Sequence, residues 1–307
     1  MSRLTLMSAV CVLAIAACSG PKEETETVAP EAPVEETIVV EEPDTVAVEP
    51  GMEAGTLAWA LAGDWRSEDE KARDSQRHPA ETLEFFGLSG DETVVEIWPG
   101  GGWYSNILAP WLHANGGKLI AATFDPASSD RAAESIQAYD DFYSANPDLF
   151  GTIGYTVFTR TSGAMGEPDS VDAVLTFRNI HNWMAGDYAD KFFTDAFAVL
   201  KPGGVLGVVE HRLPSGDDPD PSAPTGYVHE DYVKALAAAA GFEFVEASEI
   251  NANPADTGDH PFGVWTLPPV SRTADGDGNA PADFDPAAYQ AIGESDRMTL
   301  KFVKPAQ

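Results

Sequence analysis

From about residue 80 onward, short apolar runs alternate with segments in which apolar residues recur every three or four positions. The short runs are rich in β-branched residues, and such an alternation predicts βαβ units built on a parallel sheet. Seven runs are expected to be strands: 93–98, 118–124, 154–159, 170–177, 205–211, 242–250 and 298–303. The chain is therefore expected to form an α/β domain with helices on both faces of one sheet.

Three helices are expected between these strands, over about 103–112, 187–200 and 230–240, because apolar residues share one helical face in each. Glycine follows each of them closely, and glycine favours the left-handed conformation in which helices often end. The stop signals are Gly116 with Gly117, Pro202 with Gly203, and Gly241.

Residues 1–17 have the pattern of a secretory signal: one cation, then an apolar run shorter than the roughly 20 residues of a membrane span. The run ends in "IAAC", which resembles the bacterial lipobox, so Cys18 is expected to be acylated and to anchor the chain to a membrane. An ordinary signal peptide that contains Cys18 is the alternative. A periplasm-facing lipoprotein is predicted, and Ser19 after the cysteine favours the outer over the inner membrane.

Residues 18–56 are rich in Glu, Pro, Thr and Val. Such a composition cannot bury enough surface to offset chain entropy, and the segment is expected to be a disordered, acidic tether. The remaining residues, 57–307, suffice for one large domain. The formal net charge of −32 argues against a nucleic-acid partner. Cysteine occurs at positions 11 and 18, so the domain has no disulfide and no thiol nucleophile.

A glycine-rich turn, "WPGGGWYS", follows the first expected strand. Gly100, Gly101 and Gly102 would let backbone amides approach a ligand closely where the next helix starts. Asp125 lies 23 residues beyond Gly102, a spacing that suits a carboxylate accepting hydrogen bonds from both hydroxyls of a ribose. A dinucleotide-binding fold has the same pattern, and a plain tight turn is a further alternative.

The order of these features resembles the class I S-adenosylmethionine-dependent methyltransferases over about 83–304. The acid that ends the first strand, the glycine-rich turn, the acid after the second strand and "LKPGG" before the fifth all occur in sequence. Four segments resemble, more narrowly, predicted bacterial methyltransferases of unassigned substrate. They are "EIWPGGGWY", "FRNIHNW", "SEINANPADTGDHPFGVWTLPP" and "ESDRMTLKFVKP".

The resemblance implies a Rossmann-like sheet of seven strands, mostly parallel with the last antiparallel, and S-adenosylmethionine as cofactor. It implies that Glu96 helps to hold the amino-acid end of the cofactor and that Asp125 binds its ribose. Two residues depart from the family pattern: Trp98 replaces the first glycine, and Pro99 removes an amide donor beside it. Trp98 is therefore predicted to be a wall or a stacking surface of the cofactor site.

Polar residues follow the fourth and fifth strands at the carboxyl edge of the sheet, where α/β proteins form their sites. The predicted catalytic residues are Arg178, Asn179, His181, Glu210 and His211, with His181 favoured as a general base. His181, His211 and His229 with Glu210 would also suit a metal-dependent hydrolase. No metal is predicted as the main interpretation, because spacing alone carries little weight.

Two further features bear on the site. Arg66, Arg73 and Arg77 fall on one face of a helix expected before the first strand. They are predicted either to bind an anionic ligand, including the cofactor carboxylate, or to form a solvated face paired with acids. Residues 251–297 separate the last two strands and are predicted to form a long loop or lid, since connections of this length are usually functional or disordered.

The sequence thus predicts a methyltransferase that acts on a small molecule of unknown identity, tethered to the envelope. The alternative is a non-catalytic binding or scaffold lipoprotein on the same fold. Export favours this alternative, because S-adenosylmethionine is made in the cytoplasm.

Overall fold

The structure is a computed structural model that describes residues 52–306. The signal peptide predicted for 1–17, the acylation site Cys18 and nearly all of the predicted tether lie outside the described residues. Within 52–306, none of the helices has the length and apolar character needed to cross a membrane.

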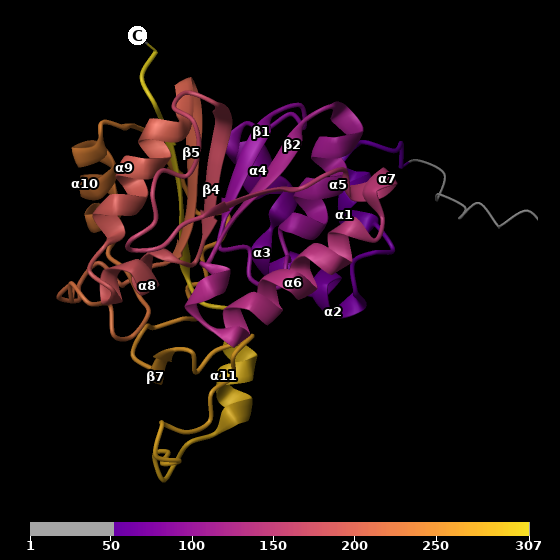
Figure 1. Cartoon of the computed structure of the whole chain (residues 1–307). Coiled ribbons are helices and arrows are strands. Elements are labelled where there is room, and N and C mark those ends of the chain that lie inside the picture. The colour runs from indigo at the N-terminus through magenta and orange to yellow at the C-terminus, as the bar shows by residue number, and fades with distance from the viewer. Residues whose placement is uncertain (1–51, 307) are drawn as a thin grey trace, which may run out of the picture. The chain divides into compact units, whose positions relative to one another are not determined.

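Seven strands form one sheet in the order β3-β2-β1-β4-β5-β8-β6 (Figure 1). The strands are β1 (Thr93–Ile97), β2 (Lys118–Thr123), β3 (Gly154–Val157), β4 (Val171–Phe177), β5 (Leu200–His211), β6 (Glu243–Ser248) and β8 (Arg297–Val303). β8 is antiparallel to both of its neighbours, β5 and β6, whereas β1 to β5 pair in parallel. The predicted seven-stranded, Rossmann-like sheet with an antiparallel last strand is confirmed.

One expectation about the fifth strand was wrong. The strand begins at Leu200 rather than at residue 205, so Pro202 and Gly203 lie within it, although the preceding helix ends at Val199, close to the predicted position. The pairing with β4 shifts register between Val171 and Ala173, because Leu200 pairs with Val171 and Val205 then pairs with Ala173. This irregularity accommodates the Pro-Gly segment, since proline cannot donate a hydrogen bond to the ladder.

Helices cover both faces of the sheet. The N-terminal part contributes α1 (Leu57–Ala62), α2 (Glu68–Lys71), α3 (Asp74–Arg77), α4 (Pro79–Phe86) and α5 (Ser105–Asn115). The middle part contributes a 3₁₀ turn, η1 (Pro126–Ser128), with α6 (Asp130–Ser144), α7 (Pro147–Phe150), α8 (Ile180–Ala185) and α9 (Ala189–Val199). α10 (Glu230–Ala240) precedes β6, and its C-terminal cap is Gly241 as predicted.

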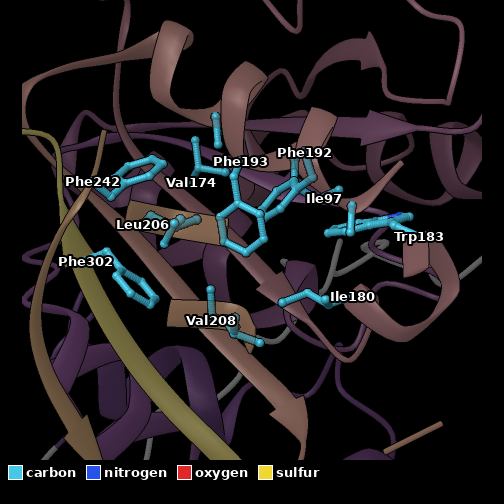
Figure 2. Close-up of a cluster of buried hydrophobic side chains, with 14 of the residues drawn as sticks. Ile97, Val174, Ile180, Trp183, Phe192, Phe193, Leu206, Val208, Phe242 and Phe302 are labelled. Carbon is cyan, nitrogen blue, oxygen red and sulfur yellow. The ribbon is translucent and has the colours of Figure 1, made fainter. Parts of the chain in front are cut away.

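Two hydrophobic clusters lie on opposite faces of the sheet, because successive strand residues point to opposite sides. Val95, Ile97 and Val174 face α8, α9 and α10, where Figure 2 shows Ile97 and Val174 together with Trp183, Phe192 and Phe193. Val94 and Leu175 belong to the other cluster, which α4, α5, α6 and α7 cover. Glu96 lies between Val95 and Ile97 and is buried on the α5 side of the sheet.

The segment predicted as a long loop contains a short strand, β7 (Pro261–Val264), and a helix, α11 (Pro286–Ile292). Figure 1 shows both at one end of the sheet, with β7 and α11 in orange and yellow. Asn253 ties the segment together, because its Nδ2 donates to the carbonyl oxygens of Ile292 (2.9 Å) and Glu294 (2.7 Å). The segment reaches the end of β4, because Glu294 Oε2 lies 3.4 Å from Nη1 of Arg178, the residue directly after that strand.

Candidate functional site

A polar cleft of about 450 Å³ lies at the carboxyl ends of β1 and β4. The turn after β1 and the residues after β4 form two of its sides, the short helices before β1 form another, and Pro269 contributes from the segment after β7. Of the predicted site residues, Glu96, Trp98, Gly100, Gly101, Arg178 and Asn179 line it, together with Arg73 and Arg77 of the arginine stripe. The carboxyl ends of parallel strands form the edge at which α/β proteins bind their ligands.

The glycines of the turn after β1 serve different purposes. A side chain at Gly100 or Gly101 would meet nothing within 4 Å, so their backbone is open to the cleft. Gly102 has φ +84°, and an added Cβ would lie 2.3 Å from the Tyr143 hydroxyl oxygen. Gly100 and Gly101 are therefore available to a ligand, whereas Gly102 is required by packing against α6.

Trp98 takes a left-handed backbone conformation with φ +49°, which is strained for a residue with a bulky side chain. Its indole Nε1 donates to the carbonyl oxygen of Phe158 at 2.9 Å. The ring also packs against Phe124 at 4.3 Å and against Trp183 at 5.6 Å between centroids. Trp98 thus fixes the ends of β1, β2 and β3 to one another and forms one wall of the cleft.

Asp125, the predicted ribose ligand, does not line this cleft. It is exposed directly after Phe124, and its Oδ1 accepts a hydrogen bond from the Ala127 amide (2.8 Å) at the start of η1. The structure therefore brings the acid of β1 and the glycines together, but it does not bring Asp125 into the same cleft.

Glu96 is buried to 3 % exposure at the base of the cleft. Its Oε2 accepts a hydrogen bond from Ser105 Oγ (2.6 Å), and Ser105 Oγ in turn accepts one from the Tyr139 hydroxyl (2.7 Å). Burial raises the pKa of Glu96 to about 7, while the bond from Ser105 opposes that change. The carboxyl can therefore exist in both protonation states near neutral pH. Sequence reasoning missed Ser105 and Tyr139.

The arginine stripe was predicted to lie on one helix, and this was wrong. Arg66 and Arg77 are buried, whereas the side chain of Arg73 is 30 % exposed. Ser67 and Glu70 form a capping box that starts α2, and α2 and α3 are separate four-residue helices. Arg66 is buried and pairs with Asp74 in a bidentate bond (2.6 and 2.8 Å). Arg73 and Arg77 instead turn to the cleft.

Arg73 and Arg77 share a carboxylate, Glu294, that the sequence did not single out. The Nε atoms of both arginines lie 2.9 Å from Glu294 Oε1. Arg297 Nη1 donates to Oε2 at 3.0 Å, and Arg178 Nη1 lies 3.4 Å from the same atom. Burial would raise the pKa of Glu294, but the four guanidinium groups lower it to about 2. Glu294 is therefore ionised at every physiological pH.

Arg178 and Asn179 are held at the end of β4 by main-chain contacts. Arg178 has φ +62°, and its amide donates to the Val209 carbonyl at 2.7 Å. Asn179 Nδ2 donates to the Ile97 carbonyl at 2.9 Å, which joins the end of β4 to the end of β1. Both side chains are therefore fixed at the edge of the cleft by the strands themselves.

His181, Glu210 and His211 form a group adjacent to Arg178 and Asn179, but they do not line the cleft. Glu210 is fully buried, its Oε1 lies 3.0 Å from His181 Nδ1, and its Oε2 accepts from the Ile180 amide at 2.5 Å. His211 Nδ1 lies 2.6 Å from Ser295 Oγ. Burial, followed by the unfavourable electrostatic interaction of a protonated imidazole with His181 and Arg178, lowers the pKa of His211 well below its usual value.

Donor atoms of this group lie within 4.8 Å of one another, a spacing that can accommodate a metal ion. Both carboxylate oxygens of Glu210 already accept main-chain hydrogen bonds, from Ile180 and His211, so the group is stable without one. The third histidine, His229, caps α10 and borders Leu213 and Glu230 at another surface. The predicted cluster of three histidines was therefore wrong: two of them meet, and His229 lies apart.

Comparison with known proteins gives structural matches without sequence matches. No protein-family model matches the sequence, and no curated protein matches it. Among solved structures, an S-adenosylmethionine-dependent methyltransferase from Aquifex aeolicus is 18 % identical, with a TM-score of 0.45 over 59 % of this chain and 87 % of the other. The [4+2]-cyclase SpnF is 19 % identical, with a TM-score of 0.49 over 80 % and 86 %. A protein described as a putative sarcosine dimethylglycine methyltransferase, from Galdieria sulphuraria, is 14 % identical, with a TM-score of 0.49 over 78 % and 87 %.

At these identities and TM-scores the matches carry no argument about activity. The fold assignment rests on the strand order of this chain, and the function has to be argued from its cleft.

Proposed function

We propose that the protein is an S-adenosylmethionine-dependent methyltransferase that acts on a small molecule. The observation that carries the proposal is the polar cleft at the ends of β1 and β4, into which the open backbone of Gly100 and Gly101 faces. A ligand at this edge of the sheet meets main-chain amides directly, because no side chain intervenes at either glycine.

The residues of the cleft fit the amino-acid end of this cofactor. Glu96 offers a buried carboxyl to an ammonium group, and the turn at Gly100 and Gly101 permits close approach. Asp125 keeps an exposed carboxylate beside Phe124, where a ribose diol could be bound by two hydrogen bonds. When bound, the cofactor supplies an electrophilic methyl group.

Methyl transfer then requires mainly that the acceptor is positioned and loses a proton. Arg178 and Asn179 are held at the edge of the cleft and would orient the acceptor. His181, favoured from the sequence as a general base, places its Nδ1 3.0 Å from Glu210 Oε1 and does not line the cleft, so we assign it and His211 a positioning role behind Arg178 and Asn179. Glu210 also holds the Ile180 amide and thereby fixes the turn after β4 that carries these residues.

Calorimetric titration with S-adenosylhomocysteine tests the binding site, and glycine variants sharpen the test. Gly101→Val should abolish binding without unfolding the protein, because a side chain there meets nothing but would block the backbone. Gly163→Val is the matched control, since its position is equally open but lies outside the cleft. A wild-type protein that gives neither heat nor a thermal shift at millimolar ligand would rule out the proposal.

The proposed location is the periplasmic side of the envelope, with the outer membrane favoured and with acylated Cys18 as the anchor. Cys18→Ser should move the protein from the membrane fraction to the soluble fraction after cell fractionation. Retention of the variant in the membrane fraction would contradict the anchor without affecting the proposal for the cleft.

A non-catalytic small-molecule binding protein is the second candidate. Two observations favour it: Trp98 replaces a glycine and packs on Phe124, and the neighbouring Asp125 lies outside the cleft. Mass spectrometry of ligands that copurify with the protein distinguishes the candidates. Recovery of an adenosyl compound supports the transferase, whereas an unrelated ligand supports the binding protein.

A further inference from the structure

The charges around Glu294 are strongly unbalanced. Four arginines surround this one carboxylate, namely Arg73, Arg77, Arg178 and Arg297, at distances from 2.9 to 3.4 Å. A single negative charge therefore leaves three positive charges without a counterpart in this cluster. The excess stands out in a protein with a formal net charge of −32. Burying like charges together is costly unless something compensates for them.

The excess positive charge borders the cleft. Arg73, Arg77 and Arg178 line it, whereas Arg297 lies behind and donates to the Gln76 carbonyl as well as to Glu294. The Arg77 side chain is 2 % exposed, and its Nη2 has no hydrogen-bond partner among residues 52–306. A buried donor without an acceptor costs free energy that a bound anion would recover.

The acids of the cleft, Glu70 and Glu96, offset the charge of these arginines only in part. Glu70 is engaged elsewhere, because its Oε2 accepts from Ser67 and its Oε1 accepts from Asn106 at 2.7 Å. Glu96 has a pKa raised to about 7 by burial, so it carries only part of a negative charge at neutral pH. The charge of Glu70 is not cancelled by its neutral donors, but Glu70 forms no ion pair with the arginines among residues 52–306, so part of the excess positive charge remains available to a ligand.

Trp103 holds Arg77 in place before any ligand binds. The Arg77 guanidinium lies 4.6 Å from the centroid of the Trp103 ring, and Arg66 lies 5.3 Å from the same ring. The Trp103 Nε1 donates to the Glu70 carbonyl at 3.1 Å, which fixes the ring. A cationic group that is already ordered loses little entropy on binding, so the arrangement favours a small, tightly held anion.

We infer that Arg73, Arg77 and Arg178 bind the carboxylate or phosphate of a second small molecule, and that the methyl acceptor is this anion. The identification of the anion as the acceptor rests on the proposed function. The cofactor brings one carboxylate together with an ammonium and a sulfonium, so it offsets at most one of the three excess charges. The remaining positive charge fits an acceptor that is itself an anion, and a negative acceptor is attracted to the sulfonium.

The test is calorimetric titration of the purified protein with inorganic phosphate and with succinate, each with and without saturating S-adenosylhomocysteine. One of the two anions should bind in both conditions. Arg73→Gln and Arg178→Gln should each weaken that binding about tenfold or more, as expected for a lost charge-assisted hydrogen bond. Arg131→Gln on the exposed surface of α6 is the control and should leave binding unchanged.

Competition experiments distinguish whether the arginines bind the acceptor anion or the carboxylate of the cofactor. Displacement of the anion by S-adenosylhomocysteine, but not by 5′-methylthioadenosine, which lacks the amino acid, would overturn the inference and assign the arginines to the cofactor carboxylate. Anion affinities that are equal in wild type and in both arginine variants would also overturn it. A protein that binds the anion but not S-adenosylhomocysteine would keep the anion site and reject the transferase.

Discussion

The indole of Trp98 packs against the ring of Phe124 with 4.3 Å between centroids, and this contact joins the turn after β1 to the end of β2. In this position Trp98 has a strained, left-handed backbone with φ +49°, which glycine would adopt without strain. The hydrogen bond from its Nε1 to Phe158 adds β3 to the same cluster. Trp98, which takes the place of a glycine in the pattern that the sequence resembles, thus joins three strand ends.

Trp98→Ala and Trp98→Gly separate the packing from the backbone strain. Trp98→Ala should lower the free energy of unfolding by about 3 kcal/mol, because it removes a large, partly buried ring and keeps the strain. Trp98→Gly should cost about 1 kcal/mol less, since glycine tolerates the positive φ. Urea unfolding measures both values. Phe142→Ala, at a ring that is 46 % exposed, is the control with a small expected loss. An alanine variant as stable as the glycine variant would show that the backbone is not strained.

Gly100 and Gly102 should differ sharply although they are two residues apart. Gly102→Ala places a Cβ 2.3 Å from the buried Tyr143 hydroxyl at φ +84°, so we expect a loss of about 3 kcal/mol in unfolding free energy. Gly100→Ala meets no atom within 4 Å at φ +60° and should cost about 1 kcal/mol. Thermal and urea unfolding give the comparison. Equal losses would mean that the positive φ, rather than the contact with Tyr143, determines the requirement for glycine.

The fold was predictable from sequence because its signals are local. Most of the seven strands are short runs rich in apolar or β-branched residues, although β6 and β8 also carry charged residues, and such runs identify a strand without knowledge of its partners. α6 was missed because charged and polar residues interrupt its apolar positions, of which Tyr139 and Tyr143 are buried. The arginine stripe was misplaced because the capping box at Ser67 and the left-handed His78 divide the segment into separate short helices.

The site was predictable only in part because its key contacts span large sequence distances. Glu96, Gly100 and Gly101 follow one strand and could be recognised together. Glu294, in contrast, meets Arg77 across 217 residues, and no local pattern indicates that pairing. Asp125 was predicted as a ribose ligand from its spacing and from the family resemblance, and it lies outside the cleft. Sequence spacing predicts the position of a residue at the end of a strand, whereas tertiary packing determines which cavity its side chain lines.

Glu96 should make the protein less stable as the pH rises through neutrality. Its pKa is about 7 when folded and 4.5 as the ordinary value, so the folded state retains a proton that the unfolded state releases. The stabilisation that Glu96 contributes by retaining this proton is complete below about pH 4.5 and is lost as the pH rises to 7 and above. Glu96→Gln keeps the shape and an acceptor for Ser105 but cannot ionise. The difference in unfolding free energy between Glu96→Gln and wild type should therefore shift in favour of the variant by up to roughly 3 kcal/mol between pH 4.5 and pH 8.

Urea unfolding of wild type and Glu96→Gln at pH 4.5, 6, 7 and 8 provides the measurement. Ser105→Ala is a useful companion, because it removes the donor that stabilises the ionised carboxylate and should steepen the loss of stability at high pH. A difference between wild type and Glu96→Gln that stays the same at all four pH values would contradict a raised pKa.

Glu294 should behave in the opposite way, because its pKa is lowered to about 2 by the four arginines. An ionised carboxylate of this kind contributes stability that is present above about pH 4.5 and is lost as the pH falls toward 2. Glu294→Gln leaves four buried or partly buried guanidinium groups without their counter-charge, and we expect a loss of about 3 kcal/mol or more in unfolding free energy at pH 7. The difference in unfolding free energy between Glu294→Gln and wild type should shrink as the pH falls from about 4.5 to 2, because the unfolded wild-type protein takes up a proton more readily than the folded one.

Sulfate gives this prediction a second, independent readout. If the arginines are left uncompensated in Glu294→Gln, sulfate should stabilise the variant more than it stabilises wild type at equal ionic strength, because a bound anion replaces the missing charge. Glu68→Gln, at an almost fully exposed carboxylate, is the control and should respond to sulfate as wild type does. A Glu294→Gln protein whose deficit neither shrinks at low pH nor responds to sulfate would have lost packing rather than charge, and the charge balance around the cleft would then need another explanation.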